Sequence, residues 1–107
     1  MKTSELIGPA LDWAVAKCEG WTYDSSELKY IKLGYTEWNY STNWEHGGPI
    51  IEREGISINQ CTDKVTWFST GGGYAYTKHG PTPLIAAMRC FVSSKLGDEV
   101  DIPKELM

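Results

Sequence analysis

Near its end the chain runs through a glycine–proline turn directly into an apolar helical sequence, between residues 79 and 97. Thr82 has the side-chain oxygen that an N-cap requires, Pro83 suits the first helical position, and Gly97 suits the end of the helix. We therefore expect a helix over residues 83–96 that packs on the core along one apolar stripe. The residues of that stripe are Leu84, Ile85, Met88, Phe91, Val92 and Leu96.

A second helix is expected near the start of the chain. Thr3 or Ser4 can provide its N-cap. Gly8-Pro9 interrupts the first turn, so the regular helix is expected from Pro9, and Gly20 ends it. Its apolar residues recur at helical spacing and are Ile7, Leu11, Ala14, Val15 and Cys18.

The segment between these helices contains the expected strands. Residues 28–33 are the best strand candidate in its first part, and residues 40–48 have the composition of a loop. Pro49 is expected to open a short helix that Gly55 ends. Alternating apolar residues predict half-buried strands after it, with a hairpin across residues 64–78. The alternating residues are Ile56, Ile58, Val65, Trp67, Tyr74 and Tyr76.

These elements predict one domain over residues 1–107 of the α+β class. Its antiparallel sheet of three to four strands is packed with the N-terminal and C-terminal helices, in an α/β/α-type sandwich. A chain of 107 residues can bury one modest core. Residues 98–107 form an acidic tail from which Ile102 and Leu106 can dock on the domain.

Charge and hydropathy exclude several classes of function. The net charge is −4 and the basic residues are scattered, so extended nucleic-acid binding is not expected. No apolar run approaches the ~18 residues of a membrane span, and the start of the chain lacks the apolar core of a signal peptide. We expect a cytoplasmic protein with no membrane contact, in which Cys18, Cys61 and Cys90 are reduced.

The chain carries no catalytic or metal-binding signature. The two histidines, His46 and His79, lack the spacing of a zinc site, and no G-x-S-x-G motif marks a serine nucleophile. We therefore expect no catalytic residues, no metal and no cofactor.

Two helix starts rich in glycine and proline are the candidate ligand site. In the first, Trp44 offers a ring for stacking, while Gly47 and Gly48 let backbone amides approach an anion. The alternative is a turn that merely packs Trp44.

The second helix start contains His79, Gly80 and Thr82, with Lys78 just upstream. Unpaired amides and a side-chain cation there can bind a phosphate, although a capped helix start also binds only water. Arg89 lies about 10 Å further along the helix axis, so it either holds the far end of an extended ligand or covers the edge of the core.

Together these motifs resemble the NinX-like family of small proteins from lambda-like phages and their prophages. The matching residues are 11–16, 20–21, 40–44, 47–52, Trp67 and 79–89, so the likeness covers nearly the whole chain. The first helix, residues 40–42 and the final helix are also similar to the related phage α-β-α sandwich domain. The resemblance implies an accessory phage or prophage protein in the host cytoplasm, and it brings no catalytic residues with it. Residues 22–39 stay without an assigned role.

The leading hypothesis is a non-catalytic binding module that sequesters a nucleotide-type, phosphate-bearing immune signal in counter-defence. The alternative is a protein-interaction factor that inhibits a host enzyme or assists phage DNA metabolism. A nucleotide hydrolase that uses His46 or His79 is the third hypothesis. The expected partners are therefore a nucleotide-type small molecule or a host protein, and a homo-oligomer could complete the pocket.

Overall fold

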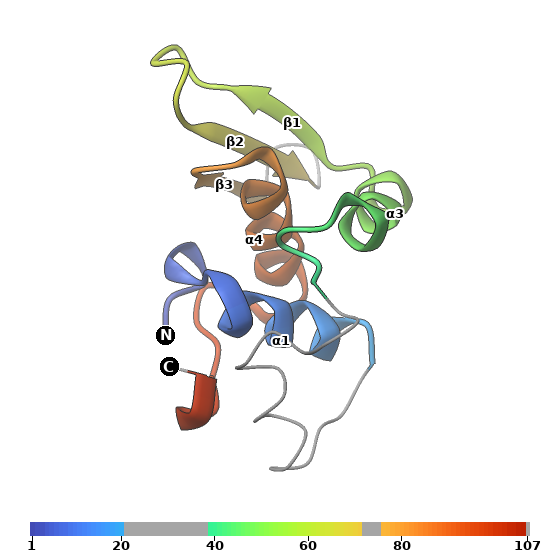
Figure 1. Cartoon of the computed structure of the whole chain (residues 1–107), viewed down its shortest axis with the longest axis vertical. Coiled ribbons are helices and arrows are strands. Elements are labelled where there is room, and N and C mark those ends of the chain that lie inside the picture. The colour runs from blue at the N-terminus through green and yellow to red at the C-terminus, as the bar shows by residue number, and fades with distance from the viewer. Residues whose placement is uncertain (21–38, 72–75, 107) are drawn as a thin grey trace.

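The structure is a computed structural model in which residues 1–20, 39–71 and 76–106 are described. The strand expected at residues 28–33 and the expected strand residue Tyr74 lie outside them. In chain order the elements are η1 (Thr3–Glu5), α1 (Gly8–Cys18), α3 (Trp44–Glu54), β1 (Ser57–Gln60), β2 (Trp67–Gly71), β3 (Tyr76–Gly80), α4 (Pro83–Leu96) and η2 (Lys104–Leu106). Figure 1 shows the sheet at one end of the molecule, with α4 between it and α1.

The three strands form an antiparallel sheet in the order β1-β2-β3. The expected hairpin is confirmed, and its register places Trp67 opposite Gly80, Phe68 opposite His79 and Ser69 opposite Lys78. The α+β class and the three antiparallel strands are therefore confirmed. In the described residues the layers run sheet, α4, α1, so both long terminal helices lie on the same side of the sheet (Figure 1).

Helix α4 is the centre of the core. Its predicted bounds and N-cap are confirmed, because the Ile85 amide donates to Thr82 Oγ1 at 3.1 Å. The hydroxyl of Ser69 on β2 donates to the Ala86 carbonyl at 2.5 Å and ties the sheet to the helix. More of α4 is buried than the expected stripe, since the sheet, α1 and α3 surround it. The buried residues are Leu84, Ile85, Ala86, Ala87, Met88, Cys90, Phe91, Val92 and Ser93.

The expected cap of the first helix is wrong. Thr3 and Ser4 belong to the separate turn η1, and α1 begins at Gly8 after Ile7, with no side-chain cap. The Thr3 hydroxyl instead donates to the Gly97 carbonyl at 2.7 Å, across the fold. Pro9 does lie in the first turn of α1, as its fixed backbone angle favours.

Helix α3 begins five residues earlier than Pro49, so the expected loop at residues 40–48 is wrong in its second half. Asn43 is the N-cap, and its side chain accepts a hydrogen bond from the Glu45 amide at 2.9 Å. Pro49 lies inside the helix. Gly48 favours this arrangement, because it lacks the Cβ through which a residue before proline clashes in a helix. Gly55 ends the helix at a φ of 64°, as expected.

The first and last described residues lie side by side (Figure 1). The Met1 amine donates to the Val100 carbonyl at 2.9 Å, and the Thr3 amide donates to the Asp98 carbonyl at 2.8 Å. Docking of the tail is confirmed, since Leu106 is buried and packs with Trp13 and Ile102.

Candidate functional site

The residues that the sequence offers for ligand binding divide between two pockets. One pocket lies beside β3, and the other lies where α3 and α4 begin. His79, Gly80 and Arg89 lie at the first pocket, whereas Trp44 and Thr82 meet at the second. Gly47 and Gly48 line neither of them. The two expected half-sites therefore come together only through Trp44 and Thr82.

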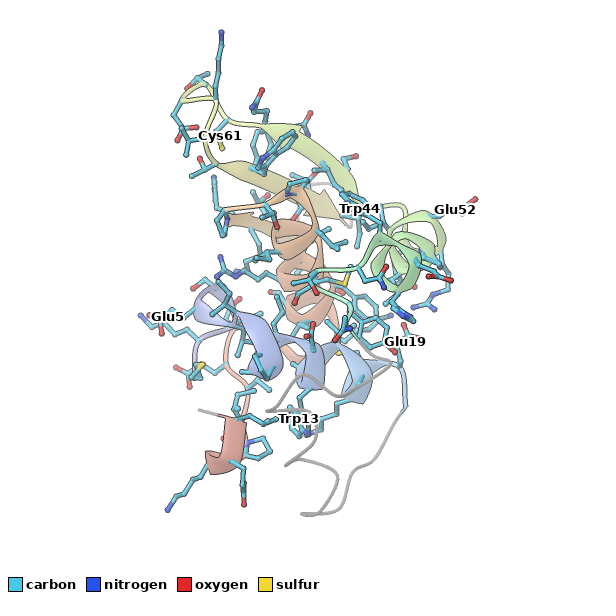
Figure 2. The ribbon with its side chains drawn as sticks, in the orientation of Figure 1. Glu5, Trp13, Glu19, Trp44, Glu52 and Cys61 are labelled. Atoms are coloured by element: carbon cyan, nitrogen blue, oxygen red, sulfur yellow. The ribbon has the colours of Figure 1, made fainter. Side chains whose placement is uncertain are left out.

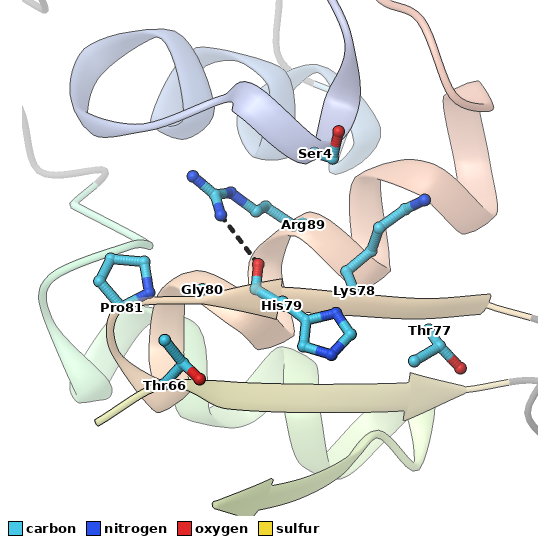
Figure 3. A pocket seen from close by; sticks show the side chains of 8 residues that line it. All are labelled: Ser4, Thr66, Thr77, Lys78, His79, Gly80, Pro81 and Arg89. Atoms are coloured by element: carbon cyan, nitrogen blue, oxygen red, sulfur yellow. Dashed lines mark hydrogen bonds between the residues drawn. The ribbon is translucent and has the colours of Figure 1, made fainter. Parts of the chain in front are cut away.

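The first pocket, called the β3 pocket below, has a volume of about 440 Å³. Figure 3 shows basic side chains from β3 and α4 around it, with a hydroxyl of η1 on the opposite side. The described residues that line it include no carboxylate. They are Ser4, Thr66, Thr77, Lys78, His79, Gly80, Pro81 and Arg89.

Arg89 is held in this pocket by two backbone carbonyls. Its Nε donates to the Leu6 carbonyl at 2.8 Å, and its Nη1 donates to the His79 carbonyl at 2.8 Å (Figure 3). Burial lowers the pKa of Arg89, but a guanidinium stays charged at any physiological pH. Its bonds to described residues use two of its five N–H donors, so other N–H groups of the guanidinium can serve a ligand.

Lys78 lies at the other side of the β3 pocket and is half-buried. Its Nζ is 3.2 Å from Asp98 Oδ1, and Asp98 is 84% exposed. The hydrogen bond from Lys78 holds the pKa of Asp98 below its ordinary value. An ion pair with so exposed a carboxylate is weak, so an incoming anion can compete for the ammonium group.

His79 and Gly80 have different roles at the β3 pocket. His79 is exposed, and its ring centroid is 6.0 Å from that of Phe68 on β2. Gly80 is buried, and a Cβ at this position would lie 2.8 Å from the Ala86 nitrogen. Close packing between β3 and α4 therefore accounts for the glycine.

The second pocket, called the helix-start pocket below, lies where α3 and α4 begin and has a volume of about 240 Å³. Trp44 is 53% exposed there, and Figure 2 shows it at the start of α3. The lining residues are Ser41, Thr42, Trp44, Thr82, Pro83, Leu84 and Ile85.

The two glycines of α3 behave differently. A Cβ on Gly47 would lie 2.6 Å from both Leu84 Cδ1 and the Tyr40 carbonyl oxygen, so packing of α3 against α4 requires glycine. A Cβ on Gly48 would meet nothing within 4 Å.

A buried polar contact lies behind the helix-start pocket. The Ser41 amide donates to Asp12 Oδ1 at 2.8 Å, and Asp12 is only 7% exposed. Burial raises the pKa of Asp12, and hydrogen bonding from Ser41 opposes part of that increase. The Ser41 hydroxyl is itself buried and has no hydrogen-bond partner among the described residues.

Sequence reasoning missed Ser4, Thr66 and Ser41 as lining residues. Ser4 and Ser41 come from segments distant in sequence from β3 and α4, so no local spacing could have connected them. Thr66 lies within the expected hairpin of residues 64–78, whose pairing could have indicated it. In the described parts of the chain, no three His, Cys, Asp or Glu side chains gather as metal ligands. No helix in those parts is long and apolar enough to cross a membrane.

The fold and the pockets define a small α+β domain with a basic pocket beside one strand of its sheet. A protein-family model described as Bacteriophage P22, NinX matches residues 2–95. The chain thus belongs to this phage NinX family, as its sequence motifs predicted, and is a small phage protein. A comparison with curated proteins gave no match.

Proposed function

We propose that this protein binds a small phosphate-bearing molecule of nucleotide type and withholds it from a host receptor without converting it. The observation that carries the proposal is the β3 pocket, where Arg89, Lys78 and His79 gather with no carboxylate among the described lining residues. Guanidinium and ammonium groups are the side chains that proteins use most for phosphate.

The electrostatics of the chain support an anion at this place. The net charge of −4 disfavours a long polyanion, which would approach the whole surface. A small ligand with one or two phosphates contacts only the local positive region and avoids most of that repulsion. The pocket therefore favours a nucleotide-sized anion over a nucleic acid.

Arg89 supports the proposal by being fixed before a ligand arrives. Both carbonyl bonds orient the guanidinium, so binding loses little side-chain freedom at this residue. The Ser4 hydroxyl also lines the pocket and can donate a hydrogen bond to a bound phosphate. The Thr66 hydroxyl lines it too, but donates its own proton to Asp63 Oδ2 at 2.8 Å.

Isothermal titration calorimetry with pyrophosphate, cyclic nucleotides and ADP-ribose-type nucleotides tests the proposal. We expect one of these ligands to bind more tightly than ~100 µM, which corresponds to about 5.5 kcal/mol. Lys78→Met should weaken its binding about threefold to tenfold, while Lys104→Met, in η2, removes the same charge and should change nothing.

Two results would overturn the proposal. Binding weaker than ~100 µM for every ligand would exclude a nucleotide as the ligand of this protein. It would favour the alternative of a protein partner, which a pull-down from host lysate then tests. Mass spectrometry of the ligand after prolonged incubation should return it unchanged. Turnover that is lost in His79→Ala would instead make the protein a hydrolase.

A further inference from the structure

We infer that the helix-start pocket is a second binding site, which takes a flat heteroaromatic ring with hydrogen-bond acceptors on its edge. Trp44 is the surface on which the ring stacks, and the Ser41 hydroxyl is its polar anchor. The inference does not rest on the β3 pocket, since a ring without any phosphate would bind here.

The first observation is the Ser41 side chain. Ser41 is 2% exposed and lines the pocket, yet its hydroxyl makes no hydrogen bond to the described residues. It is close enough to the Asp12 carboxylate to lower that group's pKa, but it does not reach hydrogen-bond geometry. A buried hydroxyl without a partner is uncommon in folded proteins, and an acceptor atom of a ligand would satisfy it.

The second observation is the arrangement of backbone amides at the two helix starts. Asn43 accepts hydrogen bonds from the amides of Glu45, His46 and Gly47. The Trp44 amide donates to none of the described residues, because the first turn of a helix has no internal acceptors.

The start of α4 also has one amide without an acceptor among the described residues. Thr82 accepts hydrogen bonds from the amides of Ile85 and Ala86, and Pro83 has no amide hydrogen. Leu84 therefore keeps an amide hydrogen at the positive end of the helix. Both amides, unbonded within the described part of the chain, belong to residues that line the pocket, where they favour acceptor atoms.

The third observation is the shape and lining of the pocket. Trp44 is exposed at its rim, while Pro83, Leu84 and Ile85 supply apolar walls. The volume of about 240 Å³ is below that of pockets for drug-sized ligands, so it suits a single ring system. An exposed tryptophan beside apolar walls and a few donors is the arrangement on which heteroaromatic rings stack.

Titration with adenosine, guanosine and uridine tests the inference, because these nucleosides carry the ring and no phosphate. We expect at least one nucleoside to shift the amide signals of Trp44 and Leu84 in two-dimensional NMR spectra. Trp44→Ala should weaken its binding by about fivefold or more, as expected for loss of a stacking surface. Ser41→Ala keeps the amide bond to Asp12 and should weaken binding about twofold to tenfold.

Matched controls separate a ligand site from a folding defect. Val65, in the turn between β1 and β2, is 71% exposed, so Val65→Ala should bind the nucleoside as well as the parent protein. Trp44→Phe keeps an aromatic face and should retain part of the affinity. Lys78→Met should leave nucleoside binding unchanged. This variant therefore tests the proposed β3 pocket separately from the proposed ring site.

Three results would overturn the inference. The first is that the amide signals of Trp44 and Leu84 do not shift at a nucleoside concentration of about 10 mM, which would place any dissociation constant above that order of magnitude. The second is equal binding by Trp44→Ala and the parent protein. The third is loss of nucleoside binding in Lys78→Met, which would place the ring in the β3 pocket instead.

Discussion

The Nε atom of Arg89 donates a hydrogen bond to the carbonyl oxygen of Leu6 at 2.8 Å, which joins the middle of α4 to the chain just after η1. The same guanidinium donates to the His79 carbonyl, so three separate segments meet at one side chain. One wall of the β3 pocket therefore depends on a contact between residues at opposite ends of the sequence.

Arg89→Lys should destabilise the fold even though it keeps the positive charge. A lysine cannot donate to both carbonyls in the fixed fork of a guanidinium, and Leu6 is fully buried. We expect a loss of about 1–3 kcal/mol in the free energy of unfolding, measured by urea denaturation. Lys104→Met should stay within about 0.5 kcal/mol of the parent protein. A lysine variant as stable as the parent would show that the two carbonyl bonds contribute nothing.

Asp98→Asn should strengthen anion binding in the β3 pocket. The substitution removes the carboxylate that holds Lys78 at 3.2 Å and also removes a nearby negative charge. We expect about twofold to fivefold tighter binding of pyrophosphate by calorimetry, which is the size of effect that exposed ion pairs have. Glu105→Gln, in η2, makes the same charge change and should leave the affinity unaltered. Weaker binding in Asp98→Asn would mean that Asp98 positions Lys78 instead of competing for it.

Asp12 predicts a pH dependence of stability. Burial raises its pKa in the folded protein above the ordinary value of 3.8, so the folded state holds its proton more tightly than the unfolded chain. The stability that Asp12 contributes is therefore complete below the unfolded pKa and is lost as the pH rises through the folded pKa. Urea denaturation between pH 3 and pH 7, on the order of the range that the shift affects, should show this loss as a falling stability of the parent relative to Asp12→Asn as the pH rises.

Two substitutions separate the charge of Asp12 from its hydrogen bond. Asp12→Asn still accepts the Ser41 amide and should be at least as stable as the parent at neutral pH, without the loss described above. Asp12→Ala leaves that buried amide without an acceptor and should cost about 1–3 kcal/mol. An asparagine variant as unstable as the alanine variant would contradict this account of the carboxylate.

The adjacent glycines of α3 should respond differently to alanine. Gly47→Ala places a methyl group 2.6 Å from Leu84 Cδ1 and from the Tyr40 carbonyl oxygen, so α3 must move away from α4. We expect a cost of about 1–3 kcal/mol in the free energy of unfolding.

Gly48→Ala is the matched control, because its methyl group would meet nothing within 4 Å. Its gain in helix propensity of about 1 kcal/mol is offset by the clash of its Cβ with Pro49. Thermal unfolding of the two variants should therefore show a lower midpoint for Gly47→Ala and little change for Gly48→Ala. Equal destabilisation would mean that the proline, and not packing on Leu84, dominates at both positions.

Elements with local signals could be predicted from the sequence. The bounds of α4 follow from Thr82, Pro83 and Gly97, which act through their own backbone and side chains. The start of α3 was missed for a local reason too: Pro49 suits a first helical position, but Asn43 is the residue that caps the helix. Gly48 reduces the clash that disfavours a helical residue before proline.

The pockets could be predicted only in part. Lys78, His79 and Gly80 are neighbours in sequence, so their common location required no knowledge of the fold. The partners of Arg89 and the contact between Ser41 and Asp12 join residues far apart in the chain. No periodicity or spacing encodes such contacts, because they arise only when η1, α1 and α4 pack together.

The central position of α4 has a consequence for the order of events during synthesis. In chain order, α1, α3 and the whole sheet precede the helix on which they pack, so they leave the ribosome before it does. Until α4 has been synthesised, the apolar faces that pack against it stay exposed. Met1 and Thr3 can form their hydrogen bonds only once Val100 and Asp98 have been added. We therefore expect the domain to complete its fold only after α4 has been synthesised, with exposure to chaperones and proteases concentrated before that point.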